Sequence, residues 1–236
     1  MALPKLMHPV FELKVPSTKK EVKFRPFLVK EEKLLLMAKQ SGEQKDVVTA
    51  LKQIITNCDV ESKLDVDSLA SFDVDYLFLK LRAKSINNMI DLAYTDYEDD
   101  QTYKFEVDAD QIEITYNEDH KDVIMLSETS GISMKHPSMD LMSRAVEEQD
   151  ITSLLFFMIK GCMDHYFDGD NIVYFKDSSP SEIDEFVDNL PTNVIKDFEK
   201  FFDTMPKLYH KLEYTNSKGT ERVIELRTLE DFFTLR

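Results

Sequence analysis

The sequence is poor in the residues that build disulfide frameworks, phosphate loops and structural metal sites. It has two cysteines, five glycines and no tryptophan in 236 residues. Cys58 and Cys162 are too few for a disulfide framework and fit a reducing compartment, so we expect both to be packing residues. No two glycines are adjacent or separated by a single residue, which excludes both common types of glycine-rich nucleotide-binding loop.

Long hydrophobic runs are also missing. The longest apolar stretch, Ile151 to Ile159, is about half of the roughly 20 residues that are needed to span a bilayer. The first residues, MALPKLMHPVFELKV, lack the continuous apolar core and the small-residue cleavage site of a secretory signal. We therefore expect no membrane span and a location in the cytoplasm.

The chain lacks a balance of charge, because 45 Asp and Glu residues outnumber 29 Lys and Arg residues and give a formal net charge of −16. A chain of this charge is repelled by nucleic acid and by anionic membranes, so a protein partner is expected and a nucleic-acid partner is not. The densest basic group, Lys19 to Arg25, alternates with apolar and acidic residues. This pattern predicts the solvent face of a β-hairpin, with a local contact to an acidic partner as the alternative.

Signatures of catalysis are absent as well. No G-x-S-x-G motif is present, and the carboxylates of Asp96, Glu98, Asp99 and Asp100 lie in an expected turn. There, water should keep them ionised with ordinary pKa values on a solvated loop surface. We therefore expect no enzyme and assign no catalytic, cofactor-binding or metal-binding residue. The alternative is an enzyme whose carboxylate pair is assembled from distant positions.

The histidines do not have the spacing of metal ligands. They are His8, His120, His136, His165 and His210. Cys162 and His165 come within one helical turn, but such a pair supplies at most two of the four ligands of a structural zinc site. The run Asp164 to Phe175 resembles a calcium loop around Gly169, yet Tyr166 and Phe175 occupy two ligand positions. A tight turn into a strand is the better interpretation.

Hydrophobic periodicity predicts an opening hairpin over residues 11–24, followed by three helices. These cover 29–40, about 47–57, and 73–85, the last with Asp73 as its cap. Alternation then predicts consecutive antiparallel strands between Ile90 and Met134. Helical periods return from Ser138, with Asp150 as the cap of the next helix and Pro191 as the first residue of another.

The predicted fold class is therefore α+β, with a helical core, an N-terminal β-hairpin, a small inserted antiparallel β unit and a C-terminal β-hairpin. We expect three regions, which are residues 1–85, 86–136 and 137–236. The segments Leu92–Thr95 and Leu212–Thr215 share the pattern L-x-Y-T at the start of their hairpins. This similarity reflects either duplication or the strand propensity of Thr and Tyr.

Three segments carry a resemblance to a known family. They are VKFRPFLVKEEKLLLMA (22–38), LRAKSINNMIDLAY (81–94) and MPKLYHKLEYTNSKGTERVIELRTLEDFF (205–233). Together they resemble the baseplate hub assembly proteins of T4-like bacteriophages, over nearly the whole chain. The most specific parts are F-R-P-F-L-x-x-E-E-K and E-L-R-T-L-E-D-F-F.

The resemblance implies a chaperone-like, non-catalytic factor that helps to build the central hub of the baseplate. Its partners would be other phage baseplate hub proteins, and its place the host cytoplasm during infection. The alternative is a permanent structural subunit of the hub in the virion baseplate. The oligomeric state is left open.

The resemblance also bears on the two hairpins. Some relatives have zinc-ribbon-like hairpins near positions 94–103 and 214–223, but this chain lacks the metal ligands there. We therefore expect two metal-free hairpins that are held by packing alone and lean on helices. The expected packing residues are Tyr94, Phe105, Tyr214, Ile224 and Phe232.

Overall fold

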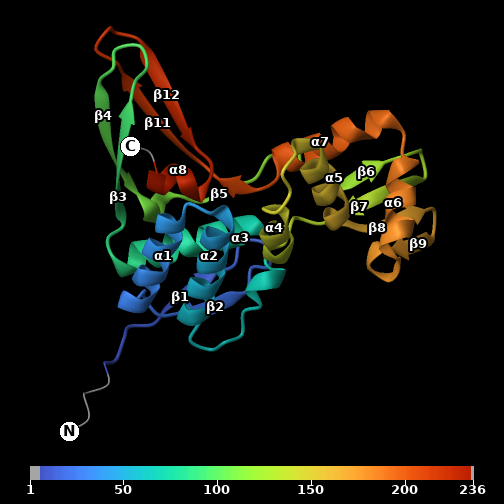
Figure 1. The fold of residues 1–236 in the computed structure, drawn as a ribbon, viewed down its shortest axis with the longest axis horizontal. Helices are drawn as coiled ribbons and strands as arrows, with labels where there is room; N and C mark the ends of the chain where they lie inside the picture. The colour runs from blue at the N-terminus through green and yellow to red at the C-terminus, as the bar shows by residue number, and fades with distance from the viewer. Residues whose placement is uncertain (1–5, 235–236) are drawn as a thin grey trace. The chain divides into compact units, whose positions relative to one another are not determined.

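The computed structural model describes residues 6–234 of the chain (Figure 1). It contains two compact units. The first unit consists of the residues up to 115 together with those from 207 onward, and the second unit consists of residues 116–206. Helices and small antiparallel sheets, including hairpins near both ends of the chain, confirm the α+β class.

The first unit has four α-helices and eight strands among its described residues. The helices are α1 (Val29–Ser41), α2 (Gln44–Cys58), α3 (Ser71–Ser85) and α8 (Leu229–Thr234), with 3₁₀ turns at Val66–Ser68 and Ala109–Gln111. The strands are β1 (Phe11–Lys14), β2 (Glu21–Phe24), β3 (Met89–Thr95), β4 (Thr102–Asp108), β5 (Ile114–Thr115), β10 (Lys207–Leu208), β11 (His210–Thr215) and β12 (Glu221–Leu226).

The strands of the first unit pair in twos, as β1–β2, β3–β4, β5–β10 and β11–β12, all antiparallel. Isolated hairpins are marginal in water, so each needs a surface to pack on. That surface comes from the helices, which supply most of the fully buried side chains. The largest of them in this unit are Phe24, Ile54, Ile55, Leu77, Phe78, Leu79, Leu81, Ile112 and Phe232.

The opening hairpin is joined to the helices by two buried carboxylates. Glu31, in the first turn of α1, is fully buried and accepts hydrogen bonds from the Arg25 guanidinium at 3.0 and 3.2 Å and from the Leu28 amide at 2.9 Å. Burial alone would raise the pKa of Glu31, but the hydrogen bonds from Arg25 and the Leu28 amide, together with the Arg25 charge, outweigh it and lower that pKa. The carboxylate therefore stays ionised and links β2 to α1.

Asp73 does not cap α3 as predicted. The helix begins at Ser71 after Ala70, and Asp73 lies within its first turn with its side chain fully buried. Its carboxylate accepts hydrogen bonds from both the backbone N–H, at 2.8 Å, and the hydroxyl of Ser17 in the turn between β1 and β2. Asp73 thus contributes to the same connection between hairpin and helices, which a local capping pattern cannot reveal.

The second unit has four α-helices beside a four-stranded sheet. The helices are α4 (Met139–Ala145), α5 (Ile151–Cys162), α6 (Pro180–Asp188) and α7 (Ile195–Thr204), with 3₁₀ turns at Phe175–Asp177 and Thr192–Val194. The strands are β6 (Val123–Met125), β7 (Ser130–Met134), β8 (Met163–Asp168) and β9 (Asn171–Tyr174), in the antiparallel order β6-β7-β8-β9. Their core includes Ile132, Ile159, Cys162, Phe198 and Phe201.

Of the two helix starts predicted in the second unit, the structure confirms one and contradicts the other. The predicted cap Asp150 is confirmed, because its carboxylate accepts hydrogen bonds from the amides of Thr152 and Ser153 at the start of α5. Pro191 is not the first residue of a helix. It precedes the 3₁₀ turn Thr192–Val194, which leads directly into α7.

The strands predicted between Ile90 and Met134 exist but do not form one sheet. β3 and β4 pair only with each other, β5 pairs with β10, and β6 and β7 continue into β8 and β9. The two units therefore divide the chain at residues 115 and 206 rather than at the changes of period near 85 and 136. Periodicity identifies strands, whereas their pairing depends on residues far away in the sequence.

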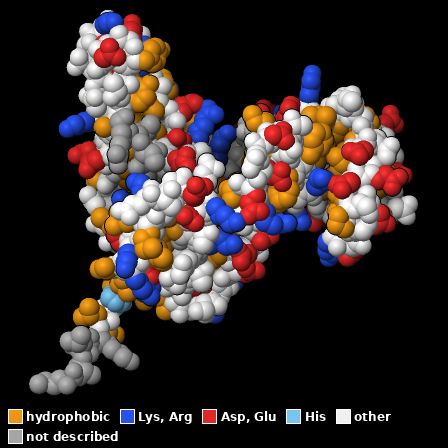
Figure 2. Space-filling view, viewed as in Figure 1, with side chains coloured by type: hydrophobic (Ala, Val, Ile, Leu, Met, Phe, Trp, Pro, Cys, Tyr) orange, Lys and Arg blue, Asp and Glu red, His pale blue; other side chains and the backbone are white. Residues whose placement is uncertain are grey.

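Acidic and basic side chains are interspersed with hydrophobic ones over the face shown in Figure 2. Among the helices of the described residues, none combines the length and the apolar character needed to cross a membrane.

Candidate functional site

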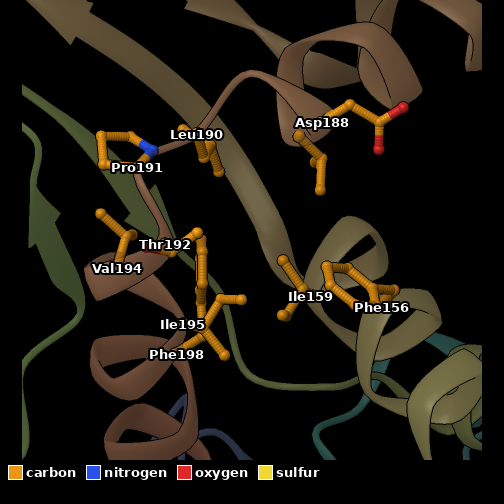
Figure 3. A pocket seen from close by; sticks show the side chains of 10 residues that line it. Phe156, Ile159, Asp188, Leu190, Pro191, Thr192, Val194, Ile195 and Phe198 are labelled. Atoms are coloured by element: carbon orange, nitrogen blue, oxygen red, sulfur yellow. The ribbon is translucent and has the colours of Figure 1, made fainter.

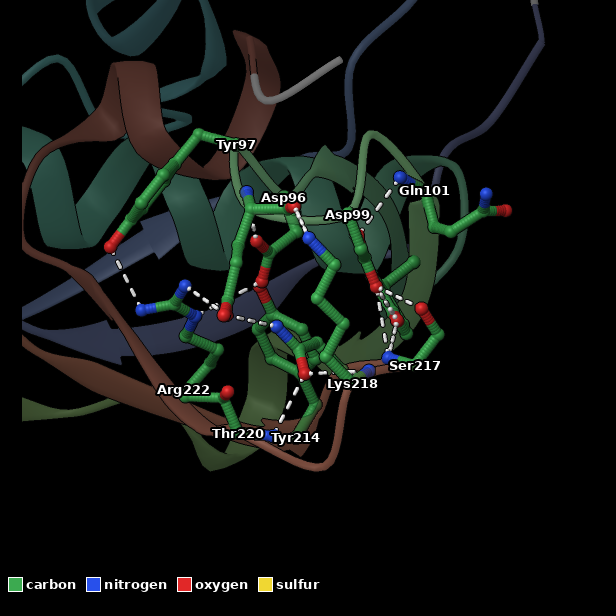
Figure 4. A network of polar contacts seen from close by, with 12 residues as sticks. Asp96, Tyr97, Asp99, Gln101, Tyr214, Ser217, Lys218, Thr220 and Arg222 are labelled. Atoms are coloured by element: carbon green, nitrogen blue, oxygen red, sulfur yellow. Dashed lines mark hydrogen bonds and ion pairs between the residues drawn. The ribbon is translucent and has the colours of Figure 1, made fainter.

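The two L-x-Y-T hairpins, β3–β4 and β11–β12, lie side by side (Figure 1), and their turns bind each other (Figure 4). The Tyr214 hydroxyl donates a hydrogen bond to Asp96 at 2.6 Å, and the Arg222 Nε donates to the same carboxylate at 3.2 Å. Arg222 also reaches Glu98 through Nη2 at 2.7 Å. We call this set of contacts between the acidic turn after β3 and the β11–β12 hairpin the clasp.

Further contacts complete the clasp around Asp99 and Glu98. The Ser217 amide and hydroxyl donate to Asp99 at 2.9 and 2.7 Å, and the Tyr103 hydroxyl donates to it at 2.7 Å. The Asn216 side-chain amide donates to Glu98 at 2.7 Å. The acidic turn is therefore bound by the other hairpin and is not the solvated loop surface that its composition suggests.

Aromatic packing accompanies these polar contacts. The Tyr214 ring lies 4.6 Å from Tyr103, 5.5 Å from Phe105 and 6.2 Å from Tyr94, measured between ring centroids. Helix α8, which carries the fully buried Phe232, packs against β3. Of the expected packing residues, Tyr94 and Phe105 contact Tyr214, while Ile224 pairs with Leu212 across the β11–β12 hairpin. Packing alone does not hold the hairpins, since the carboxylate contacts join them as well.

The ordinary pKa values expected for the acidic turn are wrong for three carboxyl groups. The Tyr214 hydrogen bond, together with a backbone amide and the Arg222 charge, lowers the pKa of Asp96, and the Asn216 hydrogen bond contributes most to lowering that of Glu98. Burial alone would raise the pKa of Asp99, but hydrogen bonds from Tyr103, Ser217 and a backbone amide hold it well below its usual range.

These shifts argue against acid–base chemistry at the clasp. A general acid or base needs a pKa near the working pH, whereas the clasp carboxylates are held ionised and their oxygens already accept hydrogen bonds. Asp100 lies in the same turn with a φ of 57°. The clasp is a structural connection within the first unit.

The other residues considered from sequence are placed as follows. Cys58 and Cys162 are buried, and burial raises the pKa of each thiol to about 12, so neither is a reactive thiolate. His165 pairs with Asp164 at 2.8 Å. The run from Asp164 onward forms the β8–β9 hairpin around Gly169, whose φ is +57°, which confirms the tight turn into a strand.

The basic group from Lys19 to Arg25 is largely the solvent face of the opening hairpin, as predicted. Lys19, Lys20 and Lys23 are exposed, and Lys23 pairs with Glu61 at 3.3 Å. Arg25 differs from them, because it turns inward to Glu31.

A groove with a volume of about 200 Å³ lies between helices α1, α2, α3 and α8 of the first unit. Its apolar lining consists of Leu35, Leu36, Val47, Leu51, Phe78 and Leu229. Four charged side chains complete the lining, namely Glu32, Lys39, Arg82 and Glu230. We call this feature the helical groove.

Helix geometry explains the lining of the helical groove. Positions 32, 35, 36 and 39 of α1 fall on one helical face at spacings of three, four and seven. Leu36 remains 52% exposed on this face, so a leucine side chain that helical packing would ordinarily cover still faces water. The Oε2 atom of Glu32 is buried and has no hydrogen-bond partner among the described residues. The groove thus offers apolar surface and an unsatisfied acceptor.

A second cavity, of about 180 Å³, lies in the second unit between α5 and the segment from α6 to α7 (Figure 3). Leu190, Ile195, Phe198 and Ile159 contribute apolar walls, while the Asp188 carboxylate points away from them. This cavity carries no converging polar groups of the kind that orient a small-molecule substrate.

One cluster was missed entirely by sequence reasoning. Ligand atoms of His120, Asp122 and His136 all lie within 4.8 Å of one another in the second unit. The two histidines are 16 positions apart and belong to no metal-binding motif, so their spacing gave no signal.

Comparison with known proteins gives one match. A family model described as "T4 bacteriophage base plate protein" matches residues 8–234, which is nearly the whole chain. The searches of curated proteins and of solved structures found no match.

Proposed function

The chain belongs to the T4 bacteriophage base plate protein family, and from this premise we propose that it assists assembly of the central hub of the baseplate. In this proposal it acts by binding other hub proteins in the host cytoplasm during infection, holds them in a state competent for assembly, and catalyses no reaction. Family membership supports the baseplate context. The binding mode rests on the helical groove.

The helical groove supports binding because exposed, contiguous apolar surface marks contact sites for other proteins. A partner that covers Leu36 and the half-buried Leu35 and Val47 would remove apolar surface from water. This transfer contributes about 25 cal/mol for each Å² buried, before the costs of association are subtracted. A groove between helices is suited to the apolar face of an amphipathic helix.

The acidic groups of this chain indicate which charge a partner in the helical groove should carry. The unsatisfied Oε2 atom of Glu32 would accept a hydrogen bond from a basic side chain, and the chain as a whole carries a net charge of −16. The proposed occupant is therefore an amphipathic helix of a hub protein, with apolar residues toward Leu36 and a Lys or Arg toward Glu32.

The non-catalytic part of the proposal is supported by the occupied state of the acidic groups. Asp96, Glu98 and Asp99 are engaged in the clasp, and both thiols are buried and protonated. An enzyme with a carboxylate pair is the competing proposal, but no such pair with raised and lowered pKa values lines either cavity described above.

The docking surface is tested by co-purification from infected cells with Leu36→Glu. The substitution places a charge in the groove, and Glu is compatible with a helix, so binding should fall while folding is kept. Ile151→Glu is the matched control, because Ile151 is 86% exposed at the start of α5 in the second unit.

The proposal requires that a phage baseplate protein, identified by mass spectrometry, is recovered with the wild type and with Ile151→Glu but lost with Leu36→Glu. Equal recovery with both variants would exclude the groove as the docking surface.

Mass spectrometry of purified virions separates an assembly factor from a permanent subunit. An assembly factor that leaves before the tail is complete is absent from mature particles or far below the amount of hub proteins. Recovery in a fixed stoichiometric amount would instead identify the chain as a permanent hub subunit.

A further inference from the structure

The cluster of His120, Asp122 and His136 lies where the chain enters and leaves the second unit. His120 and Asp122 belong to the entering segment, which begins after residue 115, and His136 follows strand β7. Thr204, at the end of α7 and close to the exit of the chain at residue 206, contacts His120. Four side chains from three segments thus converge at one place.

Hydrogen bonding fixes the protonation of one nitrogen of His120. The Thr204 hydroxyl donates its single proton to the Lys200 carbonyl at 2.6 Å. It can therefore only accept from His120, whose Nδ1 lies 2.9 Å away and must carry a proton. The other ring nitrogen, Nε2, is left to face the cluster.

The position of Nε2 then requires a positive species between it and a carboxylate. His120 Nε2 lies 3.1 Å from Asp122 Oδ1. In neutral imidazole with a proton on Nδ1, Nε2 presents a lone pair, and a lone pair facing a carboxylate oxygen at this distance is repulsive. A second proton or a metal ion resolves the repulsion, and the nearby His136 ring favours the metal, since metal ions are commonly bound by two imidazoles and a carboxylate.

The two rings are held in place by their surroundings. The His120 and His136 rings stack at 5.3 Å between centroids, and Phe201 packs against them at 5.1 and 5.9 Å. A metal-bound histidine usually donates its second ring N–H to a neighbouring group, and here Thr204 accepts that bond. The cluster therefore has both ligand atoms and the groups that orient them.

We propose that His120, Asp122 and His136 bind a divalent transition metal of the zinc class, with a water molecule as the fourth ligand. In tetrahedral zinc sites neighbouring ligand atoms lie about 3.4 Å apart. The ligand atoms here lie within 4.8 Å of one another, so a bound metal would have to draw them closer together. The Asp122 side chain is 63% exposed, which leaves room for the water on its side.

The proposed metal fastens the entering segment to the body of the second unit. Its ligands join residues 120 and 122 to residue 136, and Thr204 extends the connection to α7. This inference does not depend on the proposed assembly function, and its three ligands lie outside the two L-x-Y-T hairpins.

The test is calorimetric titration of the full-length chain with Zn²⁺ alone, after any bound metal has been removed with a chelator. The titration measures the number of Zn²⁺ ions bound per chain and their affinity. We expect one Zn²⁺ per chain for the wild type. Asp122→Asn should weaken binding roughly tenfold or more, because it removes a ligand charge, and His136→Ala should abolish stoichiometric binding. Thr204→Val, which keeps all three ligands but loses the hydrogen bonds of the hydroxyl to His120 and to the Lys200 carbonyl, should weaken binding about 10- to 100-fold.

His165→Ala is the matched control. His165 also pairs with an aspartate of the second unit, Asp164, but it does not belong to the cluster of His120, Asp122 and His136. It should bind Zn²⁺ as the wild type does. The exposed Asp122 side chain makes Asp122→Asn informative even if His136→Ala, which removes a ring stacked on Phe201, does not fold. Absence of stoichiometric binding by the wild type, or unchanged affinity in Asp122→Asn, would overturn the proposal.

Discussion

The Tyr214 hydroxyl donates a 2.6 Å hydrogen bond to Asp96, a residue 118 positions earlier in the chain. Tyr214 belongs to β11, and Asp96 begins the turn that follows β3. This hydrogen bond joins the β11–β12 hairpin to the β3–β4 hairpin within the first unit. The bond also brings together the two L-x-Y-T segments, since Tyr214 is the tyrosine of the second one.

Tyr214→Phe should lower the stability of the first unit. The substitution keeps the aromatic packing but leaves the buried Asp96 carboxylate with one hydrogen-bond donor fewer, which costs more than a surface contact does. We expect a lower thermal midpoint, measured by circular dichroism, and faster amide exchange at both hairpin turns.

Tyr209→Phe is the matched control for this experiment. Tyr209 also donates to a carboxylate, Glu225 at 3.0 Å, but the contact is exposed and joins the residue before β11 to β12 of the same hairpin. Little change is expected. Equal effects of the two substitutions would show that the clasp contributes nothing beyond an ordinary surface hydrogen bond.

The clasp should weaken in acid. Asp96, Glu98 and Asp99 all have pKa values below those of the unfolded chain, where they are about 4. Such groups contribute stability that is fully present above the unfolded pKa and is lost as the pH falls through the folded pKa.

Asp99→Asn isolates this contribution. The variant should be less stable than the wild type at about pH 7, and the difference should shrink as the pH falls below about 4. Chemical denaturation of both proteins over this range measures the difference. A difference that stays constant down to about pH 3 would contradict the role assigned to the Asp99 carboxylate.

Arg25→Met should destabilise the first unit by about 2–3 kcal/mol, because it leaves the fully buried Glu31 carboxylate without its guanidinium partner. Urea denaturation measures the free energy of unfolding. Lys23→Met in β2, two residues before Arg25, is the control, since Lys23 and Glu61 are both partly exposed and such pairs contribute little. A loss as small as that of the control would show that Arg25 does not compensate the buried charge.

Gly131→Ala should destabilise the second unit by about 1–3 kcal/mol through overpacking. A Cβ atom at this position would lie 2.8 Å from the Ile124 carbonyl oxygen and 2.8 Å from the Phe167 ring. The free energy of unfolding again provides the measurement. Gly169→Asn is the comparison, because the position is open and Asn tolerates its φ of +57°. If both variants are equally stable, the close approach of β6 and β7 is not required.

Local patterns predicted those features whose cause lies within a few residues. Asp150 caps α5 because its carboxylate reaches amides two and three positions later, and a capping residue before an apolar run is visible in sequence. The β8–β9 turn at Gly169 was predictable for the same reason. Both signals act over less than one helical turn.

The features that define the sites are not local. The composition of the acidic turn predicts a solvated loop, because nothing near Asp96 in the sequence indicates that Tyr214 and Arg222 cover it. Likewise, His120 meets His136 only because β7 folds beside the entering segment, where the Met134 amide donates to the Asp122 carbonyl. Composition gives the number of charges, whereas their pKa values depend on neighbours that only the fold supplies.

The pairing of β5 with β10 has a consequence for the order in which the protein is made. Synthesis proceeds from the N-terminus, and domains generally fold as units as they emerge. The whole second unit, residues 116–206, leaves the ribosome before β10 does, so it can fold while the first unit still lacks β10, β11, β12 and α8. Leu229 of α8 forms part of the helical groove. A nascent chain therefore has no complete groove until this segment has been translated.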